Sequence, residues 1–409
     1  MLAMLAGQNL RSVLYRYTNL VMLSAFLLTG LFILTFSSNA YGQVSIAGKT
    51  DQGKLHGGIE IDPEGIKAAV IRVSDVEQGF GAEVVYTEVF NTALVRAQDG
   101  KFAPEAIKAA GQAVRELYTR MQQQYQVPPR QVYIIGSSDL NADNLENLTN
   151  EVRDNTGKTI TFLSLESEMR LGIIGTIPRR YREGAIRFDN RIHSVLIDIG
   201  SDKTKGGYQQ FRQPLVGNPY YDFVAVGIPK GTTTFSNEIT QAAGEGAGIE
   251  KFALSARTLS ERSIKAALRN ELKVRPGLAH RKKVYLNGEI VRAMMTLLRP
   301  EDRQSFIPIT VDDINAFHQR AVNTPRALLN PNLSQIRDDE IRKEVERELE
   351  VVRSAFTPKS LIAGAEILKA VASEYNFQGE GKKILFARFS HLSLILSYVR
   401  LQADNVPRP

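Results

Sequence analysis

The chain has 409 residues, 43% of them hydrophobic and 23% charged, so it is expected to be globular and long enough for two domains. It contains no cysteine, which excludes disulfides, thiolate metal sites and a cysteine nucleophile. The formal net charge of +7 favours polyanionic partners, but no aromatic-interleaved basic motif accompanies it, so we expect no nucleic-acid partner. The five histidines show no metal-ligand spacing and are interpreted as surface or packing residues.

Residues 1–43 have the features of an export segment. Two arginines precede an uncharged apolar stretch at residues 20–36, and Ala40 and Gly42 follow as the small residues of a cleavage site. This order predicts a signal peptide, and an uncleaved membrane anchor is the alternative because the stretch is long for a signal. Both hypotheses place the body of the protein outside the cytoplasm, either periplasmic or held at the membrane and facing outward.

After this segment, the pattern alternates strands and helices, which favours an α/β architecture. We expect strands at residues 58–61, 67–73 and 83–90, a helix at 104–125, a strand at 132–135, a helix at 143–156, a strand at 159–164 and a helix at 166–174. The order then restarts, with strands at residues 193–199, 204–211 and 223–226, further helices and a strand at 284–286. This repeat predicts one domain at residues 57–176 and a second at residues 188–401, with the terminal helix returning toward the first domain.

Two charged segments accompany this repeat. The linker at residues 177–187 lies in an arginine-rich stretch, which is either a solvated loop or a rim that attracts a polyanion. The second domain carries extra helices at residues 311–320 and 334–355. The latter is rich in charged residues at helical spacing, so it is predicted to present a solvated face or, alternatively, a homodimer surface.

Four segments resemble the exopolyphosphatase/guanosine pentaphosphate phosphohydrolase (Ppx/GppA) family. They are LSLESEMRLGIIG (163–175), IDIGSDKT (197–204), VAVGIPKGTTTF (224–235) and SLIAGAEIL (360–368). The resemblance covers residues 57–401. It implies two ribonuclease-H-like domains in an actin-like duplication, which flank a cleft and carry extra C-terminal helices.

The resemblance also implies a chemistry, in which water attacks a terminal phosphoanhydride with the help of a divalent cation such as Mg²⁺. Matching the motifs implies Glu168 as the general base, with Glu166 as the neighbour that could be confused with it. Without the resemblance, these two glutamates would be interpreted as exposed carboxylates at a helix start. The match further implies metal ligands and phosphate-binding residues, namely Glu60 and Asp198 for the metal and Gly65, Gly200, Ser201 and Thr204 for phosphate.

The first phosphate loop departs from the family pattern, Asp-x-Gly-Ser-Asn-Ser. The corresponding residues run from Glu60 to Gly65, and Asp62 and Glu64 place negative charge where phosphate oxygens are expected. A like-charge pair at about 4 Å costs on the order of 4 kcal/mol at an effective dielectric constant near 20. Pro63 also removes a backbone donor.

The other loops depart as well. The second loop keeps Asp198 and Gly200, but the small residues that follow are replaced by Ser201, Asp202 and Lys203. A phosphate-clamping arginine is lost after the fourth strand, where the chain reads Ser-Ser-Asp-Leu-Asn at residues 137–141, and a later Gly-Gly pair becomes Asn-Gly at residues 287–288.

Two hypotheses follow. In the first, the protein is an exported binding or scaffolding module with this fold, which has lost or weakened hydrolysis and binds polyphosphate or another polyanion. In the second, it is a divergent, divalent-cation-dependent phosphohydrolase that uses Glu60, Asp198 and Glu168. If arginines such as Arg170 neutralise these carboxylates, the cluster needs no cation.

Overall fold

The computed structural model describes residues 53–63, 65–73, 82–90, 94, 99–178, 180–183, 186–214 and 220–405. The predicted export segment at residues 1–43 and Glu64 of the first loop lie outside these ranges. Within these ranges, no helix is both long and apolar enough to cross a membrane. Residues Val44–Arg180 and Phe188–Pro409 belong to one compact unit, which contains both large sheets.

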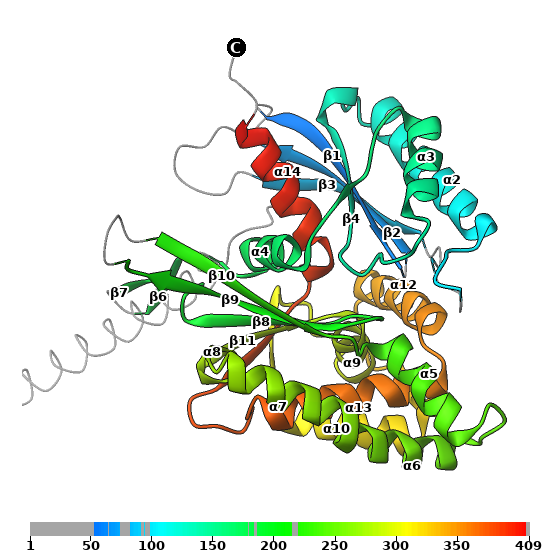
Figure 1. The fold of residues 1–409 in the computed structure, drawn as a ribbon, viewed down its shortest axis with the longest axis vertical. Helices are drawn as coiled ribbons and strands as arrows, with labels where there is room; N and C mark the ends of the chain where they lie inside the picture. The colour runs from blue at the N-terminus through cyan, green and yellow to red at the C-terminus, as the bar shows by residue number, and fades with distance from the viewer. Residues whose placement is uncertain are drawn as a thin grey trace, which may run out of the picture. The chain divides into compact units, whose positions relative to one another are not determined.

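The first large sheet has five strands in the order β3-β2-β1-β4-β5 (Figure 1). Strand β1 pairs antiparallel with β2 through a tight turn and parallel with β4 through a crossover that contains a helix. The elements of this part are β1 (Lys54–Asp62), β2 (Gly65–Val73), β3 (Ala82–Phe90), α2 (Pro104–Gln123), η1 (Pro129–Gln131), β4 (Val132–Gly136), α3 (Leu145–Thr156), β5 (Thr161–Phe162) and α4 (Leu165–Thr176).

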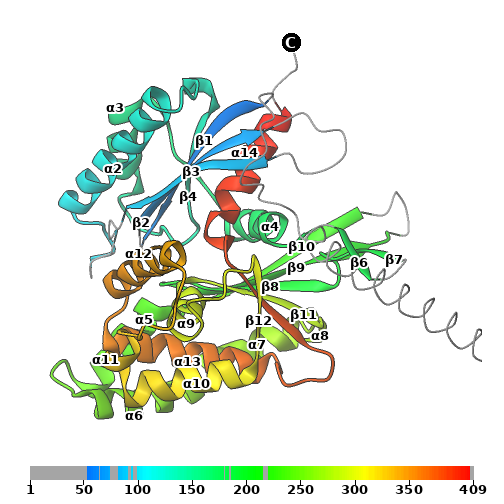
Figure 2. The ribbon, with the colours of Figure 1, turned by 180° about the vertical axis from the view of Figure 1, so that it is seen from behind.

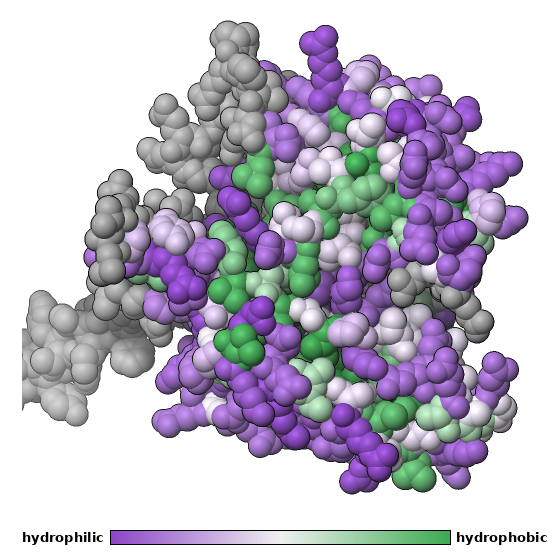
Figure 3. Space-filling model, viewed as in Figure 1, coloured by the Kyte–Doolittle hydropathy of each residue, from purple (hydrophilic) through white to green (hydrophobic). Residues whose placement is uncertain are grey.

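Successive residues of β1 point to opposite faces of the sheet, and this explains how both faces are covered. Ile59 and Ile61 point to the face covered by α2 and α3, where they join an apolar cluster. Gly58, between them, faces the last helix, α14 (Ser393–Asn405), and a Cβ there would lie 2.3 Å from Cγ2 of Ile395. The missing side chain therefore allows α14 to pack closely on the sheet, while the outward faces of α2 and α3 are hydrophilic (Figure 3).

The second large sheet has six strands in the order β10-β9-β8-β11-β13-β12. Its strands are β8 (Ser194–Ile199), β9 (Thr204–Arg212), β10 (Tyr220–Ile228), β11 (Lys283–Asn287), β12 (Phe306–Ile309) and β13 (Lys383–Ala387). The helices are α5 (Thr232–Ala243), α6 (Ile249–Leu259), η2 (Ser260–Ile264), α7 (Lys265–Val274), α8 (Gly277–His280), α9 (Glu289–Leu298), α10 (Val311–Asn323), α11 (Pro325–Leu328), α12 (Asp339–Ala355), α13 (Pro358–Glu374) and η3 (Ser390–Leu392). Helices α5, α9 and α13 share a large apolar cluster with one face of the sheet, and α6 and α10 pack on α13 (Figure 2).

Helix α4 connects the part of the unit built on the first sheet with the part built on the second sheet, which are called its two halves below. It packs against β8, β9 and β10 of the second sheet, where Met169 and Ile173 meet Leu196, and it also packs against α14. The fold is therefore two sheets of related topology with α4 and α14 between them (Figure 1). This confirms the predicted α/β class with two ribonuclease-H-like domains and the return of the terminal helix to the first sheet.

Three predicted segments differ in detail from the observed elements. The strand predicted at residues 159–164 is reduced to β5, because only Thr161 and Phe162 pair with β4. The helix predicted at residues 334–355 begins at Asp339, where Asp338 caps it, and it buries Val345, Leu349 and Val352 while its charged face is solvated. The predicted linker contains part of a separate two-stranded sheet, made of β6 (Arg180–Glu183) and β7 (Ile186–Asp189).

Candidate ligand-binding site

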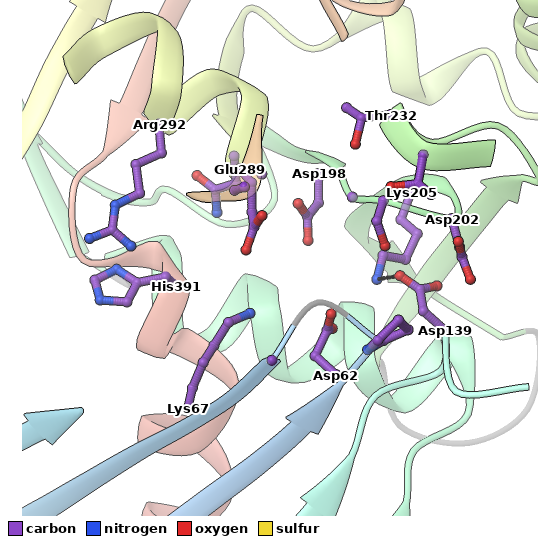
Figure 4. Close-up of a pocket in the computed structure, with 18 of the residues that line it drawn as sticks. Asp62, Lys67, Asp139, Asp198, Asp202, Lys205, Thr232, Glu289, Arg292 and His391 are labelled. Atoms are coloured by element: carbon purple, nitrogen blue, oxygen red, sulfur yellow. Dashed lines mark hydrogen bonds and ion pairs between the residues drawn. The ribbon is translucent and has the colours of Figure 1, made fainter. Parts of the chain in front are cut away.

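A cavity of about 750 Å³ lies where the carboxyl ends of the central strands of both sheets meet (Figure 4). Ligands of open α/β sheets bind at this end of the strands. The charged residues that line the cavity are Glu60, Asp62, Lys67, Asp139, Glu168, Asp198, Asp202, Lys205, Glu289 and Arg292. Glu60, Glu168 and Asp198, predicted from the sequence, are therefore brought together as expected for a shared cleft.

Two hairpins deliver matching pairs of charges to this cavity. In hairpin β1–β2, Glu60 lies opposite Lys67, and in hairpin β8–β9, Asp198 lies opposite Lys205. Residues directly opposite each other point to the same face of a sheet, so each acid and its lysine face the cavity together. The two pairs share a spacing of seven residues in the sequence, a pattern from which both lysines are predictable.

Lys205 lies at the centre of the carboxylate cluster. Its side chain is 3% exposed, and its Nζ donates hydrogen bonds to Oδ2 of Asp139 at 2.9 Å and to Oε1 of Glu168 at 2.5 Å. Burial acts to lower the pKa of Lys205, but Glu168, Asp139 and Asp198 raise it well above its ordinary value. The cluster therefore contains a permanent cation supplied by the chain itself.

Glu168 points into the cavity from the first turn of α4, and both of its carboxylate oxygens are bound. Oε1 accepts from Lys205, and Oε2 accepts from the backbone N–H of Ser138 at 2.7 Å. Burial acts to raise the pKa of Glu168, but Lys205 and Ser138 outweigh it and hold the pKa below its ordinary value. Glu166 lies on the exposed side of α4, so it is not a competing candidate for the base.

Arg170 does not neutralise the cluster, so the condition considered from the sequence is not met by this arginine. It is exposed on α4, and its guanidinium lies 5.4 Å from the centroid of the Phe223 ring. Because α4 turns about 100° per residue, Glu168 and Arg170 point to different sides of the helix. The neutralising cation is Lys205, which the sequence analysis did not identify.

The remaining two predicted acids, buried Glu60 and half-buried Asp198, have no hydrogen-bonded cation among the described residues. Burial raises the pKa of Glu60 to about 7, against the opposing effect of Lys67, and raises the pKa of Asp198 to about 6, against the opposing effect of Lys205. Nζ of Lys67 is 3.7 Å from Oε1 of Glu60, and Oε2 of Glu60 is buried with no hydrogen-bond partner in the described part of the chain.

These residues do not fit a bound Mg²⁺ as they stand. Mg²⁺ requires near-octahedral oxygen ligands at 2.0–2.1 Å. No group of three or more His, Asp or Glu side chains in the described ranges is placed to hold a metal ion. The place among Asp139, Glu168 and Asp198 where a cation would be stabilised contains the Lys205 ammonium instead.

The backbone donors beside the second loop are already engaged. The N–H groups of Thr232, Thr233 and Thr234, at the start of α5, donate to the carbonyl oxygens of Gly200 and Ser201 at 2.9 to 3.2 Å. A helix N-terminus binds an anion through such N–H groups when they are unpaired. A phosphate at this loop would therefore have to compete with the hydrogen bonds that hold the loop to the helix.

The predicted phosphate-binding residues occupy different environments. Gly65, Gly200 and Ser201 line the cavity. The N–H of Gly200 donates to the carbonyl of Lys203 within the turn. Thr204 is buried and its hydroxyl donates to the carbonyl of Lys230, so it does not line the cavity.

The end of the cavity away from Lys205 is basic. Figure 4 shows the guanidinium of Arg292 of α9 next to the ring of His391 of η3, with Lys67 reaching from below toward the middle of the cavity. Burial lowers the pKa of His391 well below its ordinary value, and Arg292 and Lys67 lower it further, so the imidazole is neutral. The sequence analysis interpreted His391 as a packing residue, and no spacing pattern in the chain connects it with the other two.

No protein-family model matches the sequence, and no curated protein is significantly similar to it. Solved structures are similar. An exopolyphosphatase-like protein is 16% identical, with a TM-score of 0.58 over 86% of this chain and 99% of its own. An exopolyphosphatase from Cytophaga hutchinsonii is 12% identical, with a TM-score of 0.57 over 87% of this chain and 99% of its own. A Ppx/GppA family member from Aquifex aeolicus is 14% identical, with a TM-score of 0.54 over 87% of this chain and 99% of its own.

The chain has the Ppx/GppA fold. This confirms the resemblance at the level of the fold, and the similarity extends over both sheets because nearly the whole length of each neighbour is covered. Within this Ppx/GppA fold, the cavity lies between the two sheets, and its residues rather than the fold must carry the argument about function.

Proposed function

We propose that the protein is a divergent, exported member of the Ppx/GppA family that works as a binding or scaffolding module, with hydrolysis of phosphoanhydrides lost or greatly weakened. The observation that carries this proposal is the state of Glu168. Its two oxygens are occupied by Lys205 and Ser138, and its pKa is lowered. A general base needs a free acceptor site for the attacking water and a pKa near the working pH. Each oxygen of Glu168 already accepts one hydrogen bond, and the lowered pKa makes the carboxylate a weaker base.

The ligand that we propose for this module is polyphosphate or another polyanion. The acidic end of the cavity, where Glu60, Asp62 and Asp198 line the wall, is unfavourable for such a ligand. The end formed by Lys67, Arg292 and His391 is more suitable, since it offers positive charge inside the same cavity. The guanidinium of Arg292 lines the cavity and forms no hydrogen bond or ion pair with any residue in the described ranges, so it is available for bidentate contact with a phosphate.

An active phosphohydrolase is the second candidate, and one observation favours it. Glu60 is buried at the cavity and has a pKa of about 7, which suits a general base at neutral pH better than that of Glu168. In this hypothesis, Glu60 is the general base and Lys205 supplies the positive charge in the cavity. The activity then does not depend on Glu168 as a proton acceptor.

Phosphate release from a short polyphosphate separates these candidates. The full chain is incubated with the substrate and excess Mg²⁺ beside Glu168→Gln and Glu60→Gln. For a binding module, we expect binding by calorimetry and equal background release from all three proteins. A rate in the wild type that exceeds that of Glu60→Gln by about 10²–10⁴-fold supports the Glu60 hydrolase and contradicts the module.

The proposed export is tested separately by a reporter fused after residue 50. Activity of a reporter that works only outside the cytoplasm is expected, because the arginines, the apolar stretch and the small residues occur in the order of an export signal. Activity only in the cytoplasm contradicts export and leaves the proposal about the cavity unaffected.

A further inference from the structure

The position of Lys205 is determined by the register of its hairpin. Because β8 and β9 pair with Asp198 opposite Lys205, the lysine side chain leaves the sheet on the cavity side, next to the carboxylate that ends the central strand. A buried lysine is costly unless its charge is matched, and here carboxylates from three other elements surround it.

The two carboxylates bonded to Lys205 come from outside its hairpin. Asp139 follows β4 of the first sheet, and Glu168 is on α4. Lys203, from the same turn as Lys205, adds a hydrogen bond from its Nζ to the carbonyl of Ser138 at 2.7 Å and lies 3.4 Å from Oδ1 of Asp139. The second hairpin is therefore joined to the first half of the unit by two lysines.

We propose that the ammonium of Lys205 takes the place of a divalent cation among Asp139, Glu168 and Asp198. The cavity then binds its ligand without a metal ion. An ammonium has three donors, and Asp139 and Glu168 receive two of them. The third has no partner among the described residues, and it is available to an acceptor atom of a ligand because Lys205 lines the cavity. Unlike a bound ion, this cation cannot leave when the ligand does.

The proposal has a direct consequence for substitutions. Removal of the ammonium leaves Asp139, Glu168 and Asp198 close together without a cation, and carboxylate oxygens are the ligands that Mg²⁺ and Mn²⁺ prefer. Loss of Lys205 should therefore create a divalent-cation site that the natural chain does not have. This consequence concerns metal binding alone, so it does not depend on whether the protein hydrolyses phosphoanhydrides.

The test compares Mn²⁺ binding by the full-length wild type, Lys205→Ala and Lys205→Met, using calorimetry and the electron paramagnetic resonance signal of free Mn²⁺. We expect at least about tenfold tighter binding by both variants, and a rise in melting temperature of roughly 5 °C when Mn²⁺ is 100-fold above its dissociation constant. Lys203→Ala is the matched control: it removes one positive charge from the same turn but leaves Lys205 in place, so it should bind Mn²⁺ like the wild type.

The outcomes decide the proposal in either direction. The proposal is overturned if the wild type binds one equivalent of Mn²⁺ as tightly as Lys205→Ala does. It is also overturned if Lys203→Ala gains as much affinity for Mn²⁺ as Lys205→Ala. If Lys205→Ala and Lys205→Met fold only when Mn²⁺ is present during refolding, the proposal is supported. If they fold without Mn²⁺ and gain no affinity, or fail to fold even with it, the ammonium does not occupy a cation site.

Discussion

Hairpins β1–β2 and β8–β9 each place an acid opposite a lysine at the edge of the cavity, yet the two lysines have different surroundings. The Lys67 side chain is 14% exposed, and its ammonium is 3.7 Å from Glu60. The Lys205 side chain is 3% exposed and contacts Asp139 and Glu168 directly. The hairpins themselves are alike, so the difference arises from the elements that pack against them: Glu168 of α4 and Asp139, which follows β4, are both bonded to the lysine of the second hairpin.

Replacement of Lys205 by Met should have the largest effect on stability. The substitution removes the only cation bonded to two buried carboxylates in the described cavity, and breaking such a buried pair costs about 3–5 kcal/mol in the free energy of unfolding. Lys67→Met is the matched variant from the other hairpin and should cost less, because Lys67 is 3.7 Å from Glu60 whereas Lys205 contacts two carboxylates directly. Urea unfolding at pH 7 measures both values, and equal losses would contradict the contrast between the hairpins.

Replacement of Glu60 by Gln should increase stability at high pH. Burial raises the pKa of Glu60 from 4.5 to about 7, so between these values the folded state holds a proton that the unfolded state has released. The stability from this group is therefore full below pH 4.5 and is lost as the pH rises through 7. We expect Glu60→Gln to exceed the wild type by roughly 3 kcal/mol at pH 8.

The control for this pH dependence is Glu166→Gln, since Glu166 is exposed on α4. As the pH rises from 4 to 8, the melting temperatures of the wild type and the control should fall by the same amount. The melting temperature of Glu60→Gln should fall less. If the melting temperatures of Glu60→Gln and the wild type change with pH in parallel, the pKa of Glu60 is not raised in the folded state.

Replacement of Glu168 by Gln should lower stability by about 1–3 kcal/mol, because one of the two carboxylates that hold Lys205 is lost. Thermal unfolding beside Glu166→Gln checks it. An unchanged melting temperature would indicate that Asp139 alone is sufficient to hold the ammonium.

The smallest predicted effect concerns the turn of the first hairpin. Changing Asp62 to Gly and Pro63 to Ser removes a negative charge from the cavity and restores a backbone donor, so phosphate should bind about tenfold more tightly, or about 1.4 kcal/mol. Calorimetry with inorganic phosphate measures this change. Ser201→Ala in the other turn is the control and should change the affinity less, since it alters no charge; weaker binding by the double variant contradicts the prediction.

The local elements around the cavity were predictable because they depend on neighbours in the sequence. Apolar runs ending at Asp62 and Asp198 indicated the two central strands, and Glu168 was placed near a helix start, where Ser164 caps α4. The repeat of topology followed from the order of these elements. The pairing of Glu60 with Lys67 and of Asp198 with Lys205 was also accessible, since strand register follows from the length of a tight turn.

The sequence by itself determined the two hairpins and the α/β repeat, and its resemblance to a family implied that three acids share one cavity. Only the tertiary structure decided which cation meets them. Arg170 is two residues from Glu168 but lies on another side of α4, whereas Lys205 is 37 residues away and bonds to it. The electrostatic state of a buried carboxylate depends on groups that packing brings within a few ångströms, and spacing along the chain does not encode that distance.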